Sequence, residues 1–137
     1  MERVSLALES YLEAIADLQN EHGAVTPSAL AEKMGCKRSS VTSALRRLAD
    51  NGLIKYQAYQ PVTLSQKGKD IIASLDRYHK ILADFLQNIL ALDENFAQTE
   101  ACQLEHQISP VTIERIAEYT AFLKDPTAFK KYLAKKK

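Results

Sequence analysis

Apolar residues recur at a helical period along most of the chain, and polar residues fill the faces between them. Several of these periodic segments follow a capping residue or precede a glycine, which marks where helices begin and end. The pattern predicts helices over about residues 5–21, 27–34, 38–51 and 66–90, one that carries Cys102, one opened by Ser109-Pro110 and one opened by Asp125-Pro126. The chain is therefore expected to be mainly helical.

The second and third predicted helices are short and are joined by a tight turn, Gly35-Cys36-Lys37. Two short helices connected in this way are typical of a helix-turn-helix. In that motif the second helix enters the major groove of DNA with its N-terminal half. The segment 38–51 is thus predicted to be a recognition helix.

The outward face of the segment 38–51 has the chemistry that DNA contacts need. Hydroxyl groups can bond bases or phosphates, and arginines suit phosphate contacts. The expected DNA-binding residues are Lys37, Arg38, Ser39, Ser40, Thr42, Ser43, Arg46 and Arg47. The alternative is a solvated basic helix with no partner, and the segment that follows argues against it.

A short hairpin is predicted directly after the recognition helix. Residues 53–57 are β-prone, Ala58-Tyr59-Gln60 forms a loop, and residues 61–64 form the return strand. A hairpin in this position is a wing. Tyr59 at its tip is expected to touch the DNA backbone or minor groove, although packing and wetting of the hairpin would explain it too.

Composition narrows the class of protein. The chain has 137 residues, 46% of them hydrophobic and 26% charged, which is ordinary for a globular protein. No apolar run approaches the length of a membrane span, so a cytoplasmic location is expected. The net charge of +1 hides a basic window around the recognition helix. Two cysteines do not suggest a disulfide framework, and metal binding or burial is expected for each.

Cys102, Glu105 and His106 stand at positions i, i+3 and i+4, which share one face if the segment is helical. Thiolate, carboxylate and imidazole together suit a divalent transition metal better than calcium or magnesium. The motif alone is weak, and a buried cysteine beside a surface glutamate and histidine is the more frequent explanation. His79 lies near the apolar stripe of the long helix, where a histidine is usually a core residue unless ligands lie beside it.

Taken together, these segments resemble the DtxR/MntR family of metal-dependent bacterial transcriptional repressors, over residues 5–123. The matching motifs are Tyr11-Leu12-Glu13-Ala14-Ile15, Ser39-Ser40-Val41-Thr42, Leu64-Ser65-Gln66-Lys67-Gly68, His79, and Glu105-His106 with Ser109. The resemblance implies a winged helix-turn-helix domain over residues 1–70, a helical metal-binding and dimerisation domain over residues 71–137, and a metal site that joins the two. From the residues alone, the apolar faces of the C-terminal helices fit a dimer interface and packing within the chain equally well.

The resemblance assigns the metal ligands unevenly. Glu13, His79, Glu105 and His106 match ligand positions of the manganese-type branch, whereas Cys102 matches the iron-type branch. Ser10 stands where both branches have a ligand. Ala83 and Gln98 occupy positions of a second iron-type site that the chain does not reproduce as the family has it. A thiolate favours Fe(II), Zn(II) or Co(II) over Mn(II), so Fe(II) is expected first, Mn(II) next, and Zn(II) is possible.

The sequence therefore predicts a metal-dependent repressor that binds a palindromic DNA operator as a homodimer when loaded with metal. The alternative is a winged-helix regulator or interaction module that responds to a protein or a small molecule. A hydrolytic metalloenzyme is less well supported, because no general base, nucleophile motif or phosphate loop is found.

Overall fold

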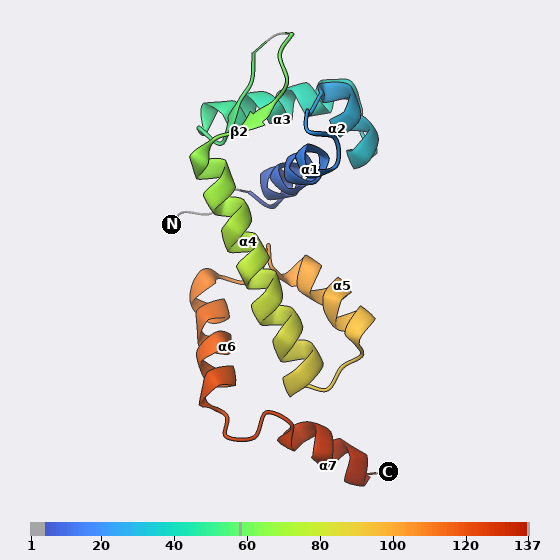
Figure 1. Cartoon of the computed structure of the whole chain (residues 1–137), viewed down its shortest axis with the longest axis vertical. Coiled ribbons are helices and arrows are strands. Elements are labelled where there is room, and N and C mark those ends of the chain that lie inside the picture. The colour runs from blue at the N-terminus through green and yellow to red at the C-terminus, as the bar shows by residue number, and fades with distance from the viewer. Residues whose placement is uncertain (1–4, 58, 137) are drawn as a thin grey trace. The chain divides into compact units, whose positions relative to one another are not determined.

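The computed structural model describes residues 5–57 and 59–136, which are mainly helical, with one small antiparallel hairpin (Figure 1). This architecture confirms the predicted fold class. The chain divides into two compact units, Met1–Ala73 and Ser74–Lys137, and the division falls within helix α4 (Gln66–Asp84). In the part of the chain that the structure describes, no helix is long and apolar enough to cross a membrane.

The first unit contains helices α1 (Leu6–His22), α2 (Pro27–Met34) and α3 (Arg38–Asp50). Thr26 caps α2 as its position predicts, its hydroxyl accepting from the Ala29 amide, and the Ser5 hydroxyl caps α1 by accepting from the Leu8 amide. Gly35 ends α2 with the left-handed φ of 63° that a glycine adopts without strain. The apolar faces of the three helices meet in a core that includes Leu12, Ile15, Leu30, Val41, Leu45 and Leu48.

The wing consists of β1 (Ile54–Lys55) and β2 (Thr63–Leu64), paired antiparallel. It confirms the predicted hairpin, although the strands are shorter than expected. Ala58 lies outside the described residues. A bridge between Val25 and Val62, with the Val62 amide donating to the Val25 carbonyl at 2.9 Å, ties the wing to the segment that precedes α2.

A second contact joins the helix-turn-helix to α1. The Tyr11 hydroxyl lies 3.4 Å from the Cys36 sulfur, which belongs to the turn between α2 and α3. The pKa of Tyr11 is raised, first by this hydrogen bond and then by partial burial. Cys36 is thus half-buried and packed in the first unit, which agrees with burial, one of the two expectations for it.

The second unit is formed by the later part of α4 (Gln66–Asp84), a π-helical turn η1 (Phe85–Ile89), α5 (Glu94–Leu104), α6 (Pro110–Phe122) and α7 (Ala128–Lys136). Asp93 caps α5 and Ser109 caps α6, as their positions predict. Leu82, Ala83, Ala101 and Ile113 form a buried cluster, against which Tyr78, Leu104 and Ile116 pack. The cluster fixes the spacing of α4, α5 and α6.

Three features of this unit differ from the prediction. The segment 66–90 is helical, but its last turn is π-helical, with the Leu90 amide donating to the Phe85 carbonyl. The final helix begins at Ala128 because Asp125 first bonds the amide and hydroxyl of Thr127 in a turn. The closing run of three lysines favours a frayed, solvated tail, but Lys135 and Lys136 belong to α7, and Lys137 lies outside the described residues.

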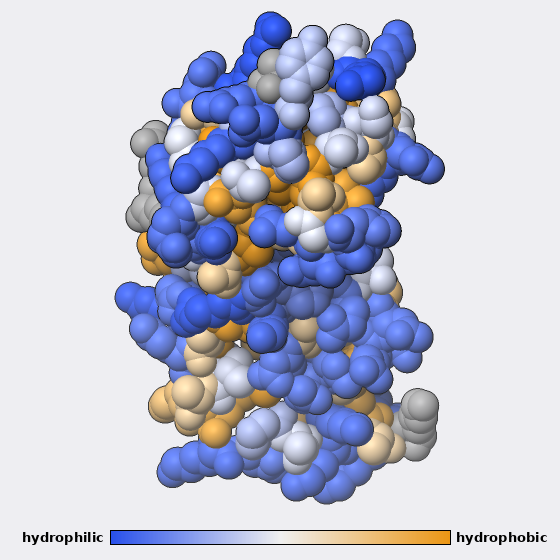
Figure 2. All heavy atoms as spheres, turned by 45° about the horizontal axis from the view of Figure 1, so that its top comes forward, coloured by the Kyte–Doolittle hydropathy of each residue, from blue (hydrophilic) through white to orange (hydrophobic). Residues whose placement is uncertain are grey.

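Polar contacts on the surface support the second unit. The Arg77 guanidinium on α4 makes a two-pronged ion pair with the Glu114 carboxylate on α6. These hydrogen bonds hold the pKa of Glu114 below its ordinary value. Figure 2 shows hydrophilic side chains over most of the visible face, with apolar residues in patches between them.

Gly68 allows the start of α4 to pass directly over the backbone of Leu53, because a β-carbon at this position would overlap the Leu53 carbonyl. We expect Gly68→Ala to destabilise the protein by about 1–3 kcal/mol through overpacking. Helix propensity alone would predict the opposite change in stability, because it favours alanine over glycine. Urea unfolding followed by circular dichroism measures the change. Lys69→Ala, an exposed substitution one residue later, is the control, and a Gly68→Ala variant as stable as the control would contradict the steric argument.

Candidate functional site

Three side chains of the second unit meet around a buried carboxylate. Glu105, directly after α5, is only 2% exposed. His79 reaches it from α4 and Cys102 from the last turn of α5. One potential ligand atom from each of the three lies within 4.8 Å of the other two. The arrangement brings a thiol, a carboxylate and the imidazole of His79 together, and the role of these groups as metal ligands stays a prediction.

Both oxygens of Glu105 face an imidazole nitrogen. Oε2 lies 3.0 Å from Nδ1 of His79, and Oε1 lies 3.4 Å from Nε2 of His106. The His106 side chain is itself 9% exposed. His106 therefore belongs to the same cluster, next to Glu105 in the sequence and on the other side of the carboxylate.

These distances fit a single divalent cation. Two donor atoms bound at right angles to one ion, each about 2.1 Å away, lie about 3.0 Å apart. A nitrogen and a thiolate sulfur on opposite sides of an ion lie about 4.4 Å apart. The observed 3.0 Å contact is close to the first value, and the upper bound of 4.8 Å on the separations within the group allows the second. The mixed donor set suits a first-row transition metal, and its positive charge would offset the charge of the buried carboxylate.

The local structure around Glu105 differs from the predicted helix face. The last residue of α5 is Leu104, so Glu105 caps the helix and His106 lies in the turn that follows. Glu105 keeps helical dihedral angles, and its amide donates to the Ala101 carbonyl at 3.0 Å. Cys102 is exposed and Glu105 is buried, the reverse of a buried cysteine beside a surface glutamate. Burial thus weighs against the simpler explanation of the motif.

Other residues named from the resemblance have ordinary local roles or lie in the first unit. The Ser10 hydroxyl donates to the Leu6 carbonyl one turn earlier in α1. Ala83 is part of the buried cluster of the second unit. Gln98 accepts from Nε2 of His79 at 2.7 Å, a contact that the sequence analysis did not predict. The signal in the sequence that could have indicated this contact is the position of Gln98, one helical turn before Cys102. Glu13 is half-buried on α1, and its role as a ligand stays a prediction.

A second group of predicted residues lies on α3. Lys37, Arg38, Ser39, Ser40, Ser43, Arg46 and Arg47 are exposed. Thr42 is half-buried, and its hydroxyl donates to the Arg38 carbonyl at 3.0 Å. The opposite face of α3 carries the buried residues Val41, Ala44, Leu45 and Leu48. The helix therefore presents a polar and basic face to solvent, as a recognition helix requires.

The wing adds a groove beside this face. A cavity of about 500 Å³ is lined by residues of the wing, of the start of α2 and of the start of α3, including Thr26, Arg38, Tyr56 and Tyr59. Tyr59 is fully exposed and has a left-handed φ of 64°, which is unusual for a residue other than glycine. A hydroxyl, a guanidinium and two phenols around one groove suit a phosphate backbone.

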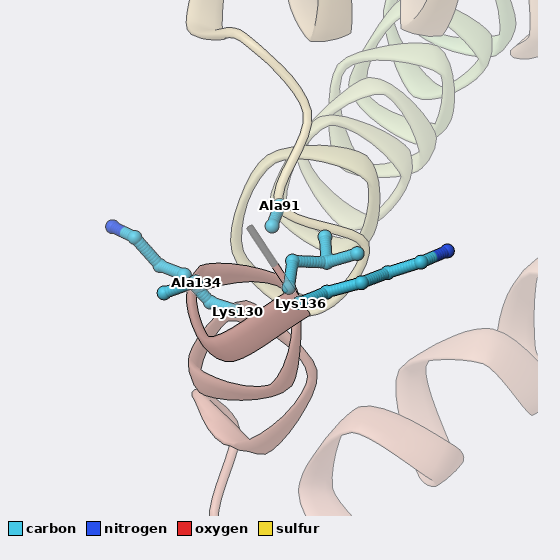
Figure 3. Close-up of a pocket in the computed structure, with 5 residues that line it drawn as sticks. Ala91, Lys130, Ala134 and Lys136 are labelled. Atoms are coloured by element: carbon cyan, nitrogen blue, oxygen red, sulfur yellow. The ribbon is translucent and has the colours of Figure 1, made fainter.

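A further pocket, of about 570 Å³, lies between α7 and Ala91, two residues after the end of η1 (Figure 3). Ala91, Lys130, Leu133, Ala134 and Lys136 line it. Among the described residues that line it, none carries a carboxylate, an imidazole or a thiol. It is not lined by aromatic residues either, which the small-molecule alternative would favour.

Comparison with known proteins decides the family. Two family models match: the N-terminal DNA-binding domain of iron-dependent repressors over residues 4–62, and their metal-binding and dimerisation domain over residues 65–127. An HTH-type transcriptional regulator of Methanocaldococcus jannaschii is 32% identical, over 89% of this chain and 98% of its own length. The chain belongs to the DtxR/MntR family of metal-dependent transcriptional repressors. Like other members, this repressor has DNA-binding, metal-binding and dimerisation functions and is not an enzyme.

Further relatives of this DtxR/MntR-type repressor include a second curated regulator and a solved structure that is named for manganese. The regulator MntR of Bacillus subtilis is 32% identical, over 93% of this chain and 89% of its own length. A manganese-dependent transcriptional repressor solved with manganese is 30% identical, with a TM-score of 0.69. The alignment covers 85% of this chain, which spans only about half (54%) of that longer one.

The family model of the metal-binding and dimerisation domain covers a part of the second unit in which large apolar side chains are exposed. Phe96 on α5 is 50% exposed, and Val111 and Phe122 on α6 are 73% and 77% exposed. Side chains of this size are buried when two subunits associate. The expectation of a homodimer that binds double-stranded DNA and a divalent metal is thus confirmed at the level of the family domains.

The basic face of α3 leads to a prediction about salt. We expect Arg46→Ala and Arg47→Ala each to weaken DNA binding by a similar factor for all sequences, because arginine side chains at these positions would contact phosphates. Log affinity falls with log salt concentration, and each variant should make this dependence less steep, by about one unit of slope. Gel-shift titrations at several salt concentrations measure both effects.

Arg115→Ala on α6 is the matched control, since the Arg115 side chain is 80% exposed and lies in the second unit. A salt slope that stays at the parent value in both α3 variants would contradict the proposed phosphate contacts.

Proposed function

We propose that this repressor senses Fe(II), which it binds through Cys102, Glu105, His79 and His106, with Glu13 from α1 as a further ligand. The observation that supports Fe(II) most directly is the thiol of Cys102 beside the imidazole of His79 and the carboxylate of Glu105. Thiolate ligands favour Fe(II), Zn(II) or Co(II) over Mn(II). As a regulator of genomic DNA, the protein is expected to act in the cytoplasm, where thiols stay reduced.

Mn(II) is the second candidate. Imidazole and carboxylate groups make up the rest of the donor set, and they bind Mn(II) as well as Fe(II). A solved relative that is 30% identical is also named for manganese. Zn(II) is possible as well, because the same donors suit it.

In the mechanism that we propose, side chains gather around the ion and thereby fix the orientation of the DNA-binding domain. When bound, the ion supplies a positive charge around which the Cys102 thiolate, the Glu105 carboxylate and the two imidazoles gather. Glu13 would join them and bring α1 with it, so that the DNA-binding domain takes one orientation. In the dimer, two recognition helices about 34 Å apart would then read the half-sites of a palindrome. An ion that binds this arrangement more tightly than the others shifts the population of molecules towards it.

We expect Fe(II) to increase operator affinity more than Mn(II) or Zn(II) does, when each is buffered at the free concentration found in cells. Anaerobic gel-shift or fluorescence-anisotropy titrations, with elemental analysis of the loaded protein, measure this preference. Cys102→Ser should weaken Fe(II) binding by at least the factor of about 10–100 that is typical for losing a supporting residue. Cys102→Asp, with a harder donor, should move the preference towards Mn(II). Activation by Mn(II) alone would rule out the proposal for iron.

Glu13 tests the link between metal and DNA. Glu13→Ala should keep its helical content but lose most of the metal-induced gain in DNA affinity, a coupling of about 1–3 kcal/mol or roughly 5–150-fold. Glu21→Ala is the control, because Glu21 lies on the same helix and its side chain is 55% exposed. If Glu13→Ala responds to metal like Glu21→Ala, then Glu13 does not couple the two functions.

A further inference from the structure

The hydrogen bond between Gln98 and His79 suggests a role that goes beyond the ligands themselves and that rests on the proposed metal function. We propose that Gln98 is a positioning residue: its side-chain oxygen holds the Nε2 hydrogen of His79 and thereby presents Nδ1 to the metal. Gln98 would not itself be a ligand. The proposal thus assigns a specific atom of His79 and a specific supporting residue.

The imidazole of His79 is held between two oxygen atoms. Nε2 lies 2.7 Å from Oε1 of Gln98, and Nδ1 lies 3.0 Å from Oε2 of Glu105. An amide oxygen can only accept a hydrogen bond, so the nitrogen that faces Gln98 carries the hydrogen. The nitrogen that faces the carboxylate is then the one whose lone pair becomes available to a cation.

The position of Gln98 on α5 connects this contact to the cluster. Gln98 precedes Cys102 by four residues, so that both lie on one face of α5, a single turn apart. One helix therefore supplies a thiol donor and the group that orients the histidine from α4. Histidine ligands in metal sites commonly donate their second ring hydrogen to an oxygen in this way, which fixes the tautomer and the orientation of the ring.

The same contact limits how many ions His79 can serve. With Nε2 bonded to Gln98, the ring has one nitrogen left for coordination, and that nitrogen faces Glu105. Ala83, one helical turn after His79, is 5% exposed and has no donor atom. His79 is thus assigned to a single ion, the one held with Cys102 and Glu105.

The test compares three variants of the full-length protein. Gln98→Leu removes the acceptor at similar size, Gln98→Glu keeps an acceptor oxygen, and Gln103→Leu is an exposed control on the same helix. Affinity is measured with Co(II) and with Cd(II) by competition against a chelator. Histidine ring nitrogens are observed by ¹⁵N NMR in protein loaded with ¹¹³Cd, where coupling to cadmium identifies the bound nitrogen. Circular dichroism checks that each variant is folded.

We expect the parent and Gln98→Glu to show cadmium coupling at Nδ1 of His79. Gln98→Leu should bind both metals about 10–100-fold more weakly, and Gln103→Leu should bind like the parent. Coupling at Nε2 in the parent, or parent-like affinity in Gln98→Leu, would overturn the role of Gln98 and leave metal sensing intact. A parent protein that binds neither cation stoichiometrically would overturn metal sensing, and the inference with it.

Discussion

A buried carboxylate is the physical constraint on which the second unit depends. Removing an ion from water costs on the order of several kcal/mol even after the surroundings relax, so a buried carboxylate has to be compensated. Glu105 meets an imidazole at each of its oxygens, one from α4 and one from the next residue. The helices around it are therefore arranged to deliver compensating groups as well as to bury apolar surface. A site with this property binds a cation without first having to bury a new charge.

Much of the fold could be predicted because its signals are local. Thr26-Pro27 and Ser109-Pro110 carry a capping side chain and a fixed φ within two residues, and α2 and α6 begin where these pairs stand. The wing followed from a β-prone run after a glycine. The end of α5 and the π-helical turn η1 could not be predicted, because they depend on packing between distant segments. The buried cluster around Leu82 and Ala101, for example, joins residues of α4, α5 and α6 that lie far apart in the sequence.

The candidate metal site was predictable to the extent that its residues lie close together in the sequence. Cys102 and Glu105 are three residues apart, and a helical period brings them together. His79 lies 26 residues before Glu105, and no spacing rule joins two helices across such a distance. Its assignment came from resemblance, and the contact with Glu105 supports it. The exposure of each residue was not predictable either, because which side of α5 faces the core is decided by its neighbours in space.

The bridge between Val25 and Val62 has a consequence for how the first unit meets a duplex. It fastens the hairpin to the residues that lead into α2, and the contact of Tyr11 with Cys36 fastens the turn before α3 to α1. Hairpin and recognition helix are therefore braced on one scaffold and cannot adjust separately to a bent or overwound site. A reader braced in this way favours operators whose DNA deforms to fit it, so the flexibility of base steps between the contacted positions will matter alongside the contacted bases.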